Sequence, residues 1–118
     1  MTTREKAQTP EDITRLFVDR ANAGDADGLA ELYEPDAVMA FPPGEQTVGR
    51  DAIRPVLAEM LEHVPAFPSE PPLPTLIHGD LALCATRSAD GTGTRAQVAR
   101  RRPDGTWERI IDRPESRS

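Results

Sequence analysis

The fold class of this 118-residue chain is decided by residues 76–112, LIHGDLALCATRSADGTGTRAQVARRRPDGTWERIID. Apolar and polar side chains alternate along much of this stretch, which is the period of strands with one buried face. Turn sequences divide it at residues 78–80, 90–93 and 103–105. The pattern predicts an antiparallel meander: a hairpin arm over 76–87, interrupted at 78–80, and strands over 94–102 and 106–112.

The chain before this meander carries the helical period instead. Thr9 is expected to cap a helix with Pro10 in its first position, and Gly24 ends it. A second, shorter helix begins after Asp25 or Asp27. Its apolar stripe is Leu29, Leu32 and Tyr33, and Pro35 stops it. A short strand over 37–41 follows.

The clearest helix starts near Asp51. Its apolar residues recur at helical spacing, and they are Ile53, Val56, Leu57, Met60, Leu61 and Val64. Half of the next stretch, residues 65–74, is proline, which excludes a central strand and predicts an extended edge. Helices first and strands last indicate an α+β fold, with a bent sheet wrapped over the helices. We expect a single domain over 9–115 and a disordered tail over 1–8.

Composition excludes several classes of protein. Only 37% of the residues are hydrophobic and the net charge is −6, so we expect a thin core that gains burial by pairing with a second subunit. No apolar run is long enough to span a membrane, and the first residues lack the apolar segment of a secretory signal, which predicts a cytoplasmic protein. Few aromatic residues and a negative charge argue against nucleic acid as a partner. The basic cluster at 100–102 is expected to be the solvated end of a strand.

Four stretches in the first half resemble the nuclear transport factor 2-like superfamily, in its SnoaL-like and ketosteroid isomerase-like branches. They are Thr9-Pro10-Glu11, residues 22–29 (NAGDADGL), residues 32–38 (LYEPDAV) and residues 49–53 (GRDAI). Residues 103–107 (PDGTW) and 110–112 (IID) are similar to the small stand-alone bacterial members. The resemblance implies a cone of three helices on a strongly curved antiparallel sheet, a deep pocket in its open mouth, and a homodimer.

The resemblance also places the catalytic positions of the family on this chain. Phe17 and Phe41 stand where the isomerase branch has its tyrosine and its base, and Ala99 stands near its late-strand acid. In the limonene epoxide hydrolase branch the three acting positions correspond to Gln97, Ala99 and Asp112, of which only the last keeps its acid. Neither mechanism is therefore expected. In SnoaL-type cyclases a last-strand aspartate acts as acid and base, and Asp112 matches it.

Asp112 is thus the candidate catalytic residue. On a cavity wall, removal from water favours its protonated form and suits it to proton transfer. The alternative is a structural carboxylate paired with Arg95 or Arg113. The other expected pocket residues are Phe17, Tyr33, Phe41, Gln97 and Ala99; for the aromatic ones, plain core packing is the alternative, and for Tyr33 a role in holding the second helix against the core.

No metal or cofactor is expected. His63 and His78 have no second ligand at metal-binding spacing, and Cys84 lies in an alternating strand, which predicts a small buried hydrophobe. Two functions therefore remain open. One is a cofactor-independent cyclase, isomerase or dehydratase acting on a hydrophobic, polyketide- or steroid-like molecule. The other is a binding or dimerisation module without catalysis, or an accessory subunit of a larger enzyme.

Overall fold

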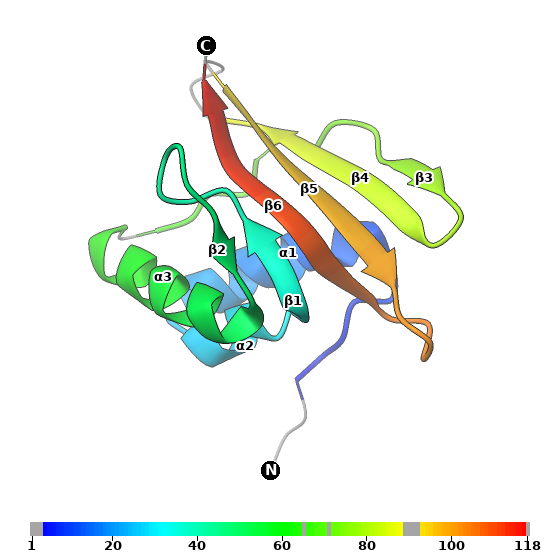
Figure 1. Ribbon diagram of the computed structural model, residues 1–118, viewed down its shortest axis with the longest axis horizontal. Helices are drawn as coiled ribbons and strands as arrows, with labels where there is room; N and C mark the ends of the chain where they lie inside the picture. Colours follow the sequence, from blue (N-terminus) through cyan, green and yellow to red (C-terminus); the bar gives the residue numbers. More distant parts are fainter. Residues whose placement is uncertain (1–3, 65, 71, 89–92, 118) are drawn as a thin grey trace.

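The computed structural model describes residues 4–64, 66–70, 72–88 and 93–117, with side chains to Pro114. Within them, three helices precede most of a six-stranded sheet (Figure 1). The helices are α1 (Pro10–Asn22), α2 (Ala26–Ala30) and α3 (Arg50–His63). The strands are β1 (Tyr33–Met39), β2 (Thr47–Val48), β3 (Leu76–His78), β4 (Leu81–Arg87), β5 (Gly93–Arg101) and β6 (Trp107–Arg117). The α+β class with a curved sheet is confirmed.

The first helix begins and ends where the sequence predicts. The Thr9 hydroxyl accepts a hydrogen bond from the backbone N–H of Asp12, whose carboxylate in turn accepts from the N–H of Thr9, so both ends of the capping box are formed. Beyond the helix, Gly24 adopts a φ of 69°, which a residue with a side chain rarely adopts. This turn directs the chain into α2, where Asp25 caps the N–H of Gly28.

The second helix is shorter than expected, and Tyr33 does not belong to it. Helix α2 ends at Ala30, and Tyr33 opens β1, which also contains Pro35. The carbonyl of Leu32 accepts from the N–H of Arg109 at 2.8 Å, so pairing with β6 draws the chain out of the helix. Pro35 is tolerated because the ladder between β1 and β6 is irregular between Tyr33 and Val38.

Helix α3 starts at Arg50, one residue before the position expected, after Gly49 with a φ of 95°. Ile53 and Leu57 are its buried residues, and they belong to the core formed mainly with α1, α2 and β1. In Figure 1, α1 and α2 lie behind the sheet and α3 lies beside β1 and β2. The helices thus cover one face of the sheet.

The strands lie in the order β2-β1-β6-β5-β4-β3. The meander from β3 to β6 is antiparallel, as expected, but β1 and β6 are parallel, so the sheet is mixed rather than antiparallel throughout. Strand β6 is longer than the stretch predicted for it. One irregularity decides the site: between the pairs Val98–Ile111 and Ala99–Arg109, β6 holds an extra residue, Ile110.

The proline-rich stretch follows the sheet edge where it is described. The N–H of Leu73 donates to the carbonyl of Ala85 at 2.8 Å, and Pro72 forms an isolated bridge with Thr86. Nearer α3, the side chain of Asn22 makes two hydrogen bonds with the backbone of Phe67. Pro65 and Pro71, and residues 90–92 of the predicted turn at 90–93, lie outside the described residues.

Residues 4–8 differ from the disordered tail that composition suggested. Ala7 is 2% exposed, and its carbonyl accepts a hydrogen bond from the N–H of Trp107. Arg4 pairs with Asp25 and Glu31. The hydrogen bond between Ala7 and Trp107 ties the segment to the start of β6, and the ion pairs of Arg4 tie it to the residues around α2. Among the described residues, no helix is long and apolar enough to cross a membrane.

Candidate active site

A cavity of about 430 Å³ lies between the helices and the concave face of the sheet. Helix α1, the end of α3 and the segment 66–70 bound it on one side, and β4, β5 and β6 bound it on the other. The lining residues are Thr14, Phe17, Val18, Met60, Val64, Ala66, Phe67, Pro68, Glu70, Thr86, Ser88, Arg95, Gln97, Arg109, Asp112 and Pro114.

The two sides of the cavity differ in chemistry. Most residues from the helices and the segment 66–68 are apolar, whereas β4, β5 and β6 contribute hydroxyl, amide and charged groups. A ligand here would lie with an apolar surface against the helices and its polar atoms toward the sheet. The cavity therefore suits a mostly apolar molecule with a few hydrogen-bonding groups.

Asp112 is the centre of the buried polar cluster on the sheet side. Its Oδ2 accepts a hydrogen bond from the Tyr33 hydroxyl at 2.5 Å, and its Oδ1 accepts from Nε2 of Gln97 at 3.2 Å. The guanidinium of Arg109 lies 3.7 Å from Oδ2 and donates to the Tyr33 hydroxyl at 3.4 Å. All four residues are buried.

Burial and charge set the protonation of this cluster. Burial, and then the negative charge of Asp112, raise the pKa of Tyr33 well above its ordinary value. The Tyr33 hydroxyl is therefore protonated at neutral pH and donates a hydrogen bond to Asp112. For Arg109, burial acts to lower the pKa, but Tyr33 and Asp112 outweigh it and the pKa is raised, so the guanidinium is charged.

A β-bulge brings Arg109 and Asp112 to the same side of the sheet. Residues three apart on a regular strand point to opposite faces, because side chains alternate with a period of two. The extra residue Ile110 shifts this alternation by one. Arg109 and Asp112 are consequently both buried toward the helices, while Ile111 is exposed on the outer face.

The structure brings together some of the expected site residues and not others. Phe17 and Gln97 line the cavity with Asp112, and Gln97 is paired with Asp112 in the ladder. Tyr33 is not on the cavity wall, and its hydroxyl donates a hydrogen bond to Asp112 from the side away from the cavity. Ala99 is buried in the core, and Phe41, which is 42% exposed, lies away from the lining residues.

The ion pair of Asp112 forms with neither of its expected structural partners. Arg95 forms a two-point ion pair with Glu70, and Arg113 is exposed. Glu70 comes from the proline-rich segment, so this ion pair joins that segment to β5 beside the cavity. Asp112 is paired instead with a residue of its own strand, Arg109.

Sequence reasoning missed Arg109 and the Glu70–Arg95 pair. Arg109 is a charged residue between Glu108 and Ile110, and no local pattern marks the bulge that turns it inward. Its guanidinium stacks on the ring of Phe17, 4.9 Å from the ring centre, and lies 5.8 Å from that of Tyr33. On the late strands, the resemblance to known families indicates only positions 97, 99 and 112.

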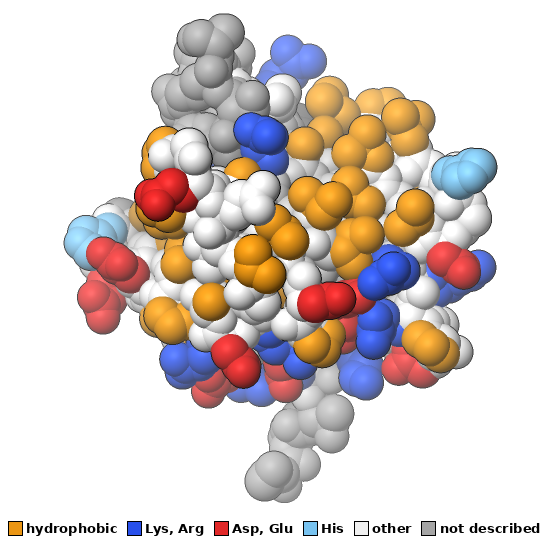
Figure 2. All heavy atoms as spheres, in the orientation of Figure 1, with side chains coloured by type: hydrophobic (Ala, Val, Ile, Leu, Met, Phe, Trp, Pro, Cys, Tyr) orange, Lys and Arg blue, Asp and Glu red, His pale blue; other side chains and the backbone are white. Residues whose placement is uncertain are grey.

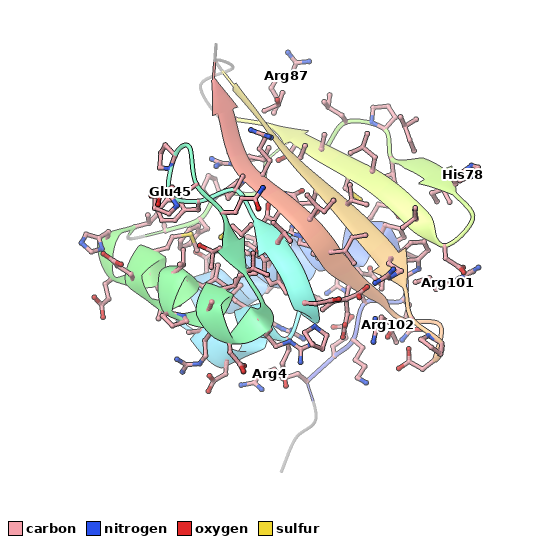
Figure 3. All side chains as sticks on the ribbon, viewed as in Figure 1. Arg4, Glu45, His78, Arg87, Arg101 and Arg102 are labelled. Carbon is pink, nitrogen blue, oxygen red and sulfur yellow. The ribbon has the colours of Figure 1, made fainter. Side chains whose placement is uncertain are left out.

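The histidines lie away from this chemistry, whereas Cys84 is buried beside it, paired with Gln97 in the ladder between β4 and β5. His63 ends α3 and bonds the carbonyl of Glu59, and His78 projects from the far end of β3 (Figure 3). Burial raises the pKa of the Cys84 thiol, as expected of a small core residue. Within the part of the chain that the structure describes, no group of three acidic, histidine or cysteine side chains could hold a metal ion.

The basic cluster 100–102 is neutralised by local acids. Arg101 and Arg102 lie at the turn between β5 and β6, away from the cavity (Figure 3). Arg100 and Arg102 bind Glu34, and Arg101 binds Asp80. These pairs agree with a solvated strand end.

Comparison with solved structures identifies the same fold in several bacterial proteins. A candidate dehydratase of the NTF2-like family from Streptomyces avermitilis superposes with a TM-score of 0.71 at 16% identity, covering 92% of this chain and 93% of that one. A ketosteroid isomerase-like protein from Erwinia carotovora atroseptica gives 0.66 at 20% identity, with 91% and 92% covered. A SnoaL-like protein of unknown function from Burkholderia thailandensis gives 0.65 at 20% identity, with 97% and 99% covered.

At these low sequence identities the matches show a shared fold, and the activities named for these proteins are not transferred to this chain. No curated protein matches the chain. The family model of the SnoaL-like domain matches residues 14–110, which include most of α1, all of α3 and the strands up to Ile110. The structures show that the chain shares the fold of NTF2-like proteins, and the family model shows that it belongs to the SnoaL-like family.

Proposed function

We propose that this protein binds a small, mostly apolar molecule in its cavity and moves a proton on it without a cofactor, with Asp112 as acid and base. The observation that carries the proposal is a buried carboxylate on the wall of a largely apolar cavity, held by Tyr33 and Gln97. Isomerisation, cyclisation and dehydration next to a carbonyl group all begin with such a proton transfer.

The two oxygens of Asp112 have different roles in this proposal. Oδ2 is held from behind by the short bond from Tyr33, which is not on the cavity wall. Oδ1 has a longer bond, from Gln97, which does line the cavity, and it keeps a second acceptor position. Oδ1 is therefore the oxygen that would take the proton from the ligand.

The proposed proton transfer uses only side chains of the cavity. As Oδ1 takes a proton from the carbon beside a ligand carbonyl, the C–H electron pair moves to the carbonyl oxygen and forms an enolate. The second N–H of Gln97 Nε2 would hydrogen-bond that oxygen, and the positive charge of Arg109 would stabilise the site. Return of the proton to another atom completes an isomerisation, and loss of a neighbouring hydroxyl as water completes a dehydration.

Deuterium exchange tests this proposal without a known substrate. Enolisable ketones of graded size, such as cyclohexanone and 2-tetralone, are incubated in D₂O, and loss of the α-proton signal is followed by NMR. We expect the wild-type protein to accelerate exchange for at least one ketone, and Asp112→Asn to abolish the acceleration. Asp36→Asn, an equivalent change at an exposed position of β1, serves as the matched control and should behave as wild type.

One observation favours a second function, binding without catalysis. Both oxygens of Asp112 already accept hydrogen bonds within the protein, which is the arrangement of a structural or ligand-orienting carboxylate. The same ketones distinguish the two functions. Saturable binding without any α-proton exchange would support a binding module, including an accessory subunit of a larger enzyme, and would contradict the catalytic proposal.

We also propose that the protein works as a homodimer joined through the outer face of its sheet. Hydrophobic side chains gather over β3, β4 and β5 on that face (Figure 2). Leu76, Leu81, Leu83 and Ile111 are each at least 41% exposed there. A thin core gains burial if such a surface pairs with a second copy, and the cavity on the opposite face stays open to its ligand.

A further inference from the structure

The guanidinium of Arg109 makes far fewer hydrogen bonds than its burial calls for. Its side chain is 6% exposed, and it carries five N–H donors. Its only hydrogen bond to a residue that the structure describes is the 3.4 Å contact from Nη1 to the Tyr33 hydroxyl. Asp112 lies 3.7 Å from the same nitrogen, beyond hydrogen-bonding distance.

The other two nitrogens of Arg109 must therefore reach open space. Among the described residues, no fully buried side-chain nitrogen or oxygen lacks a hydrogen-bond partner. Nε and Nη2 have no such partner, so they cannot be fully enclosed by protein. The space that Arg109 borders is the cavity. Its Nε–Nη2 edge thus presents donors to whatever the cavity holds.

Two other arginines of this protein bind a carboxylate through this edge. Arg95 donates from Nε and Nη2 to the two oxygens of Glu70, at 2.8 and 3.2 Å. Arg100 does the same with Glu34, at 2.9 and 2.7 Å. At Arg109 the same pair of donors faces the cavity, and its plane is held by stacking on Phe17. Asp112 does not compete for it, because it lies on the Nη1 side.

We propose that the ligand of this cavity is a carboxylic acid with an apolar body, whose carboxylate binds the Nε–Nη2 edge of Arg109. The inference rests on the proposed function, in that it concerns the same cavity, and it names the class of ligand. The planar guanidinium matches the two oxygens of a carboxylate, and the low dielectric of the site strengthens that bond. The apolar body would lie against the helix side, with the carbon that loses a proton near Asp112.

Binding of matched acids and amides tests this assignment. Dissociation constants are measured by calorimetry for benzoate, 2-naphthoate and decanoate, each against the amide of the same body. We expect at least one acid to bind about tenfold tighter than its amide, a difference that one charge-assisted pair can supply. In Arg109→Gln the preference should disappear, and Arg109→Lys, which keeps the charge but loses the planar pair of donors, should bind the acid more weakly than wild type.

Arg113→Gln is the matched control, since Arg113 is exposed on the same strand, and it should keep the wild-type preference. An NMR titration of the wild-type protein adds a measurement that needs no variant to fold: the acid should shift the side-chain Nε–H signal of Arg109. Amides that bind as tightly as the acids, no binding of any acid, an unmoved Nε–H signal, or equal losses in Arg113→Gln would each overturn the inference. Deuterium exchange that depends on Asp112 would survive that result, so the two proposals fail separately.

Discussion

Replacing Tyr33 by Phe removes one oxygen from a fully buried position and tests whether the hydroxyl supports Asp112. The hydroxyl donates to Oδ2 at 2.5 Å, and the side chain is 0% exposed. A hydrogen bond to a charged group contributes about 1.5–3 kcal/mol to stability. The variant also leaves Nη1 of Arg109 without its acceptor. We therefore expect the free energy of unfolding at pH 7 to fall by about 2–3 kcal/mol, in the upper part of that range.

The fall in the free energy of unfolding is measured by unfolding in guanidinium chloride, followed by the fluorescence of Trp107, the single tryptophan. A double-mutant cycle with Asp112→Asn shows whether the hydroxyl acts through the carboxylate. We expect a coupling energy of about 1 kcal/mol or more between the two positions. A loss below about 0.5 kcal/mol in Tyr33→Phe, which is the size of an ordinary surface effect, would refute the reasoning. Strictly additive losses would refute the assignment of Asp112 as the partner.

Three further predictions concern other groups. Tyr33 is the only tyrosine, and its burial, followed by the charge of Asp112, raises its pKa. Tyrosinate absorbance should therefore stay flat above about pH 10 until the protein unfolds. The stability that the neutral phenol contributes below about pH 10 should be lost as pH rises further. A tyrosinate step near pH 10 in folded protein would contradict this. The hydrogen bond from Arg100 and the charge of Arg102 lower the pKa of Glu34, and they outweigh burial, which acts to raise it. The ionised Glu34 side chain therefore stabilises the fold above about pH 4.3, and this stabilisation is lost as pH falls through the pKa of Glu34 in the folded protein. Glu34→Gln should lower the free energy of unfolding by on the order of 1 kcal/mol at pH 7 and flatten the loss of stability in acid. Urea melts from pH 3 to 7 that keep the wild-type slope would exclude the effect. Sedimentation should give twice the chain mass of 12.9 kDa for wild type and a monomer for Leu83→Glu, whereas a monomeric wild type would rule out the proposed dimer.

The helices were predictable because their signals are local. Thr9, Pro10 and Asp12 specify the start of α1 within four residues, and the buried positions Ile53 and Leu57 of α3 follow from spacing alone. The meander was predictable for the same reason, since each strand ends at its own turn sequence. These elements required no knowledge of distant parts of the chain.

Tyr33 shows where local reasoning fails. Leu29, Leu32 and Tyr33 have helical spacing, yet the chain leaves the helix at Ala30 because residues 32 and 33 pair with Arg109, more than 70 positions away. Tertiary pairing overrides a weak local preference in so short a helix. The prediction that placed Tyr33 on a helix was wrong for this reason.

The candidate site was accessible from sequence only in part. Resemblance to known families pointed to Asp112, Gln97 and Phe17, which the cavity does bring together. Arg109 was out of reach because its inward orientation depends on the bulge at Ile110, and no residue type signals that bulge. The same family comparison also pointed to Phe41, which the structure places on the surface.

The buried cluster around Asp112 is costly for so small a protein, and that cost bears on its purpose. Burying an ion pair with its hydrogen-bonding partners contributes little net stability, and well-packed apolar residues often serve as well or better. This chain is only 37% hydrophobic and has a thin core, yet it buries Tyr33, Arg109 and Asp112 together beside an open cavity. One edge of Arg109 is moreover left without a partner from the described residues, which no requirement of folding explains. The proposed carboxylic acid ligand would account for both features, because its oxygens would supply the acceptors that the free edge of Arg109 lacks.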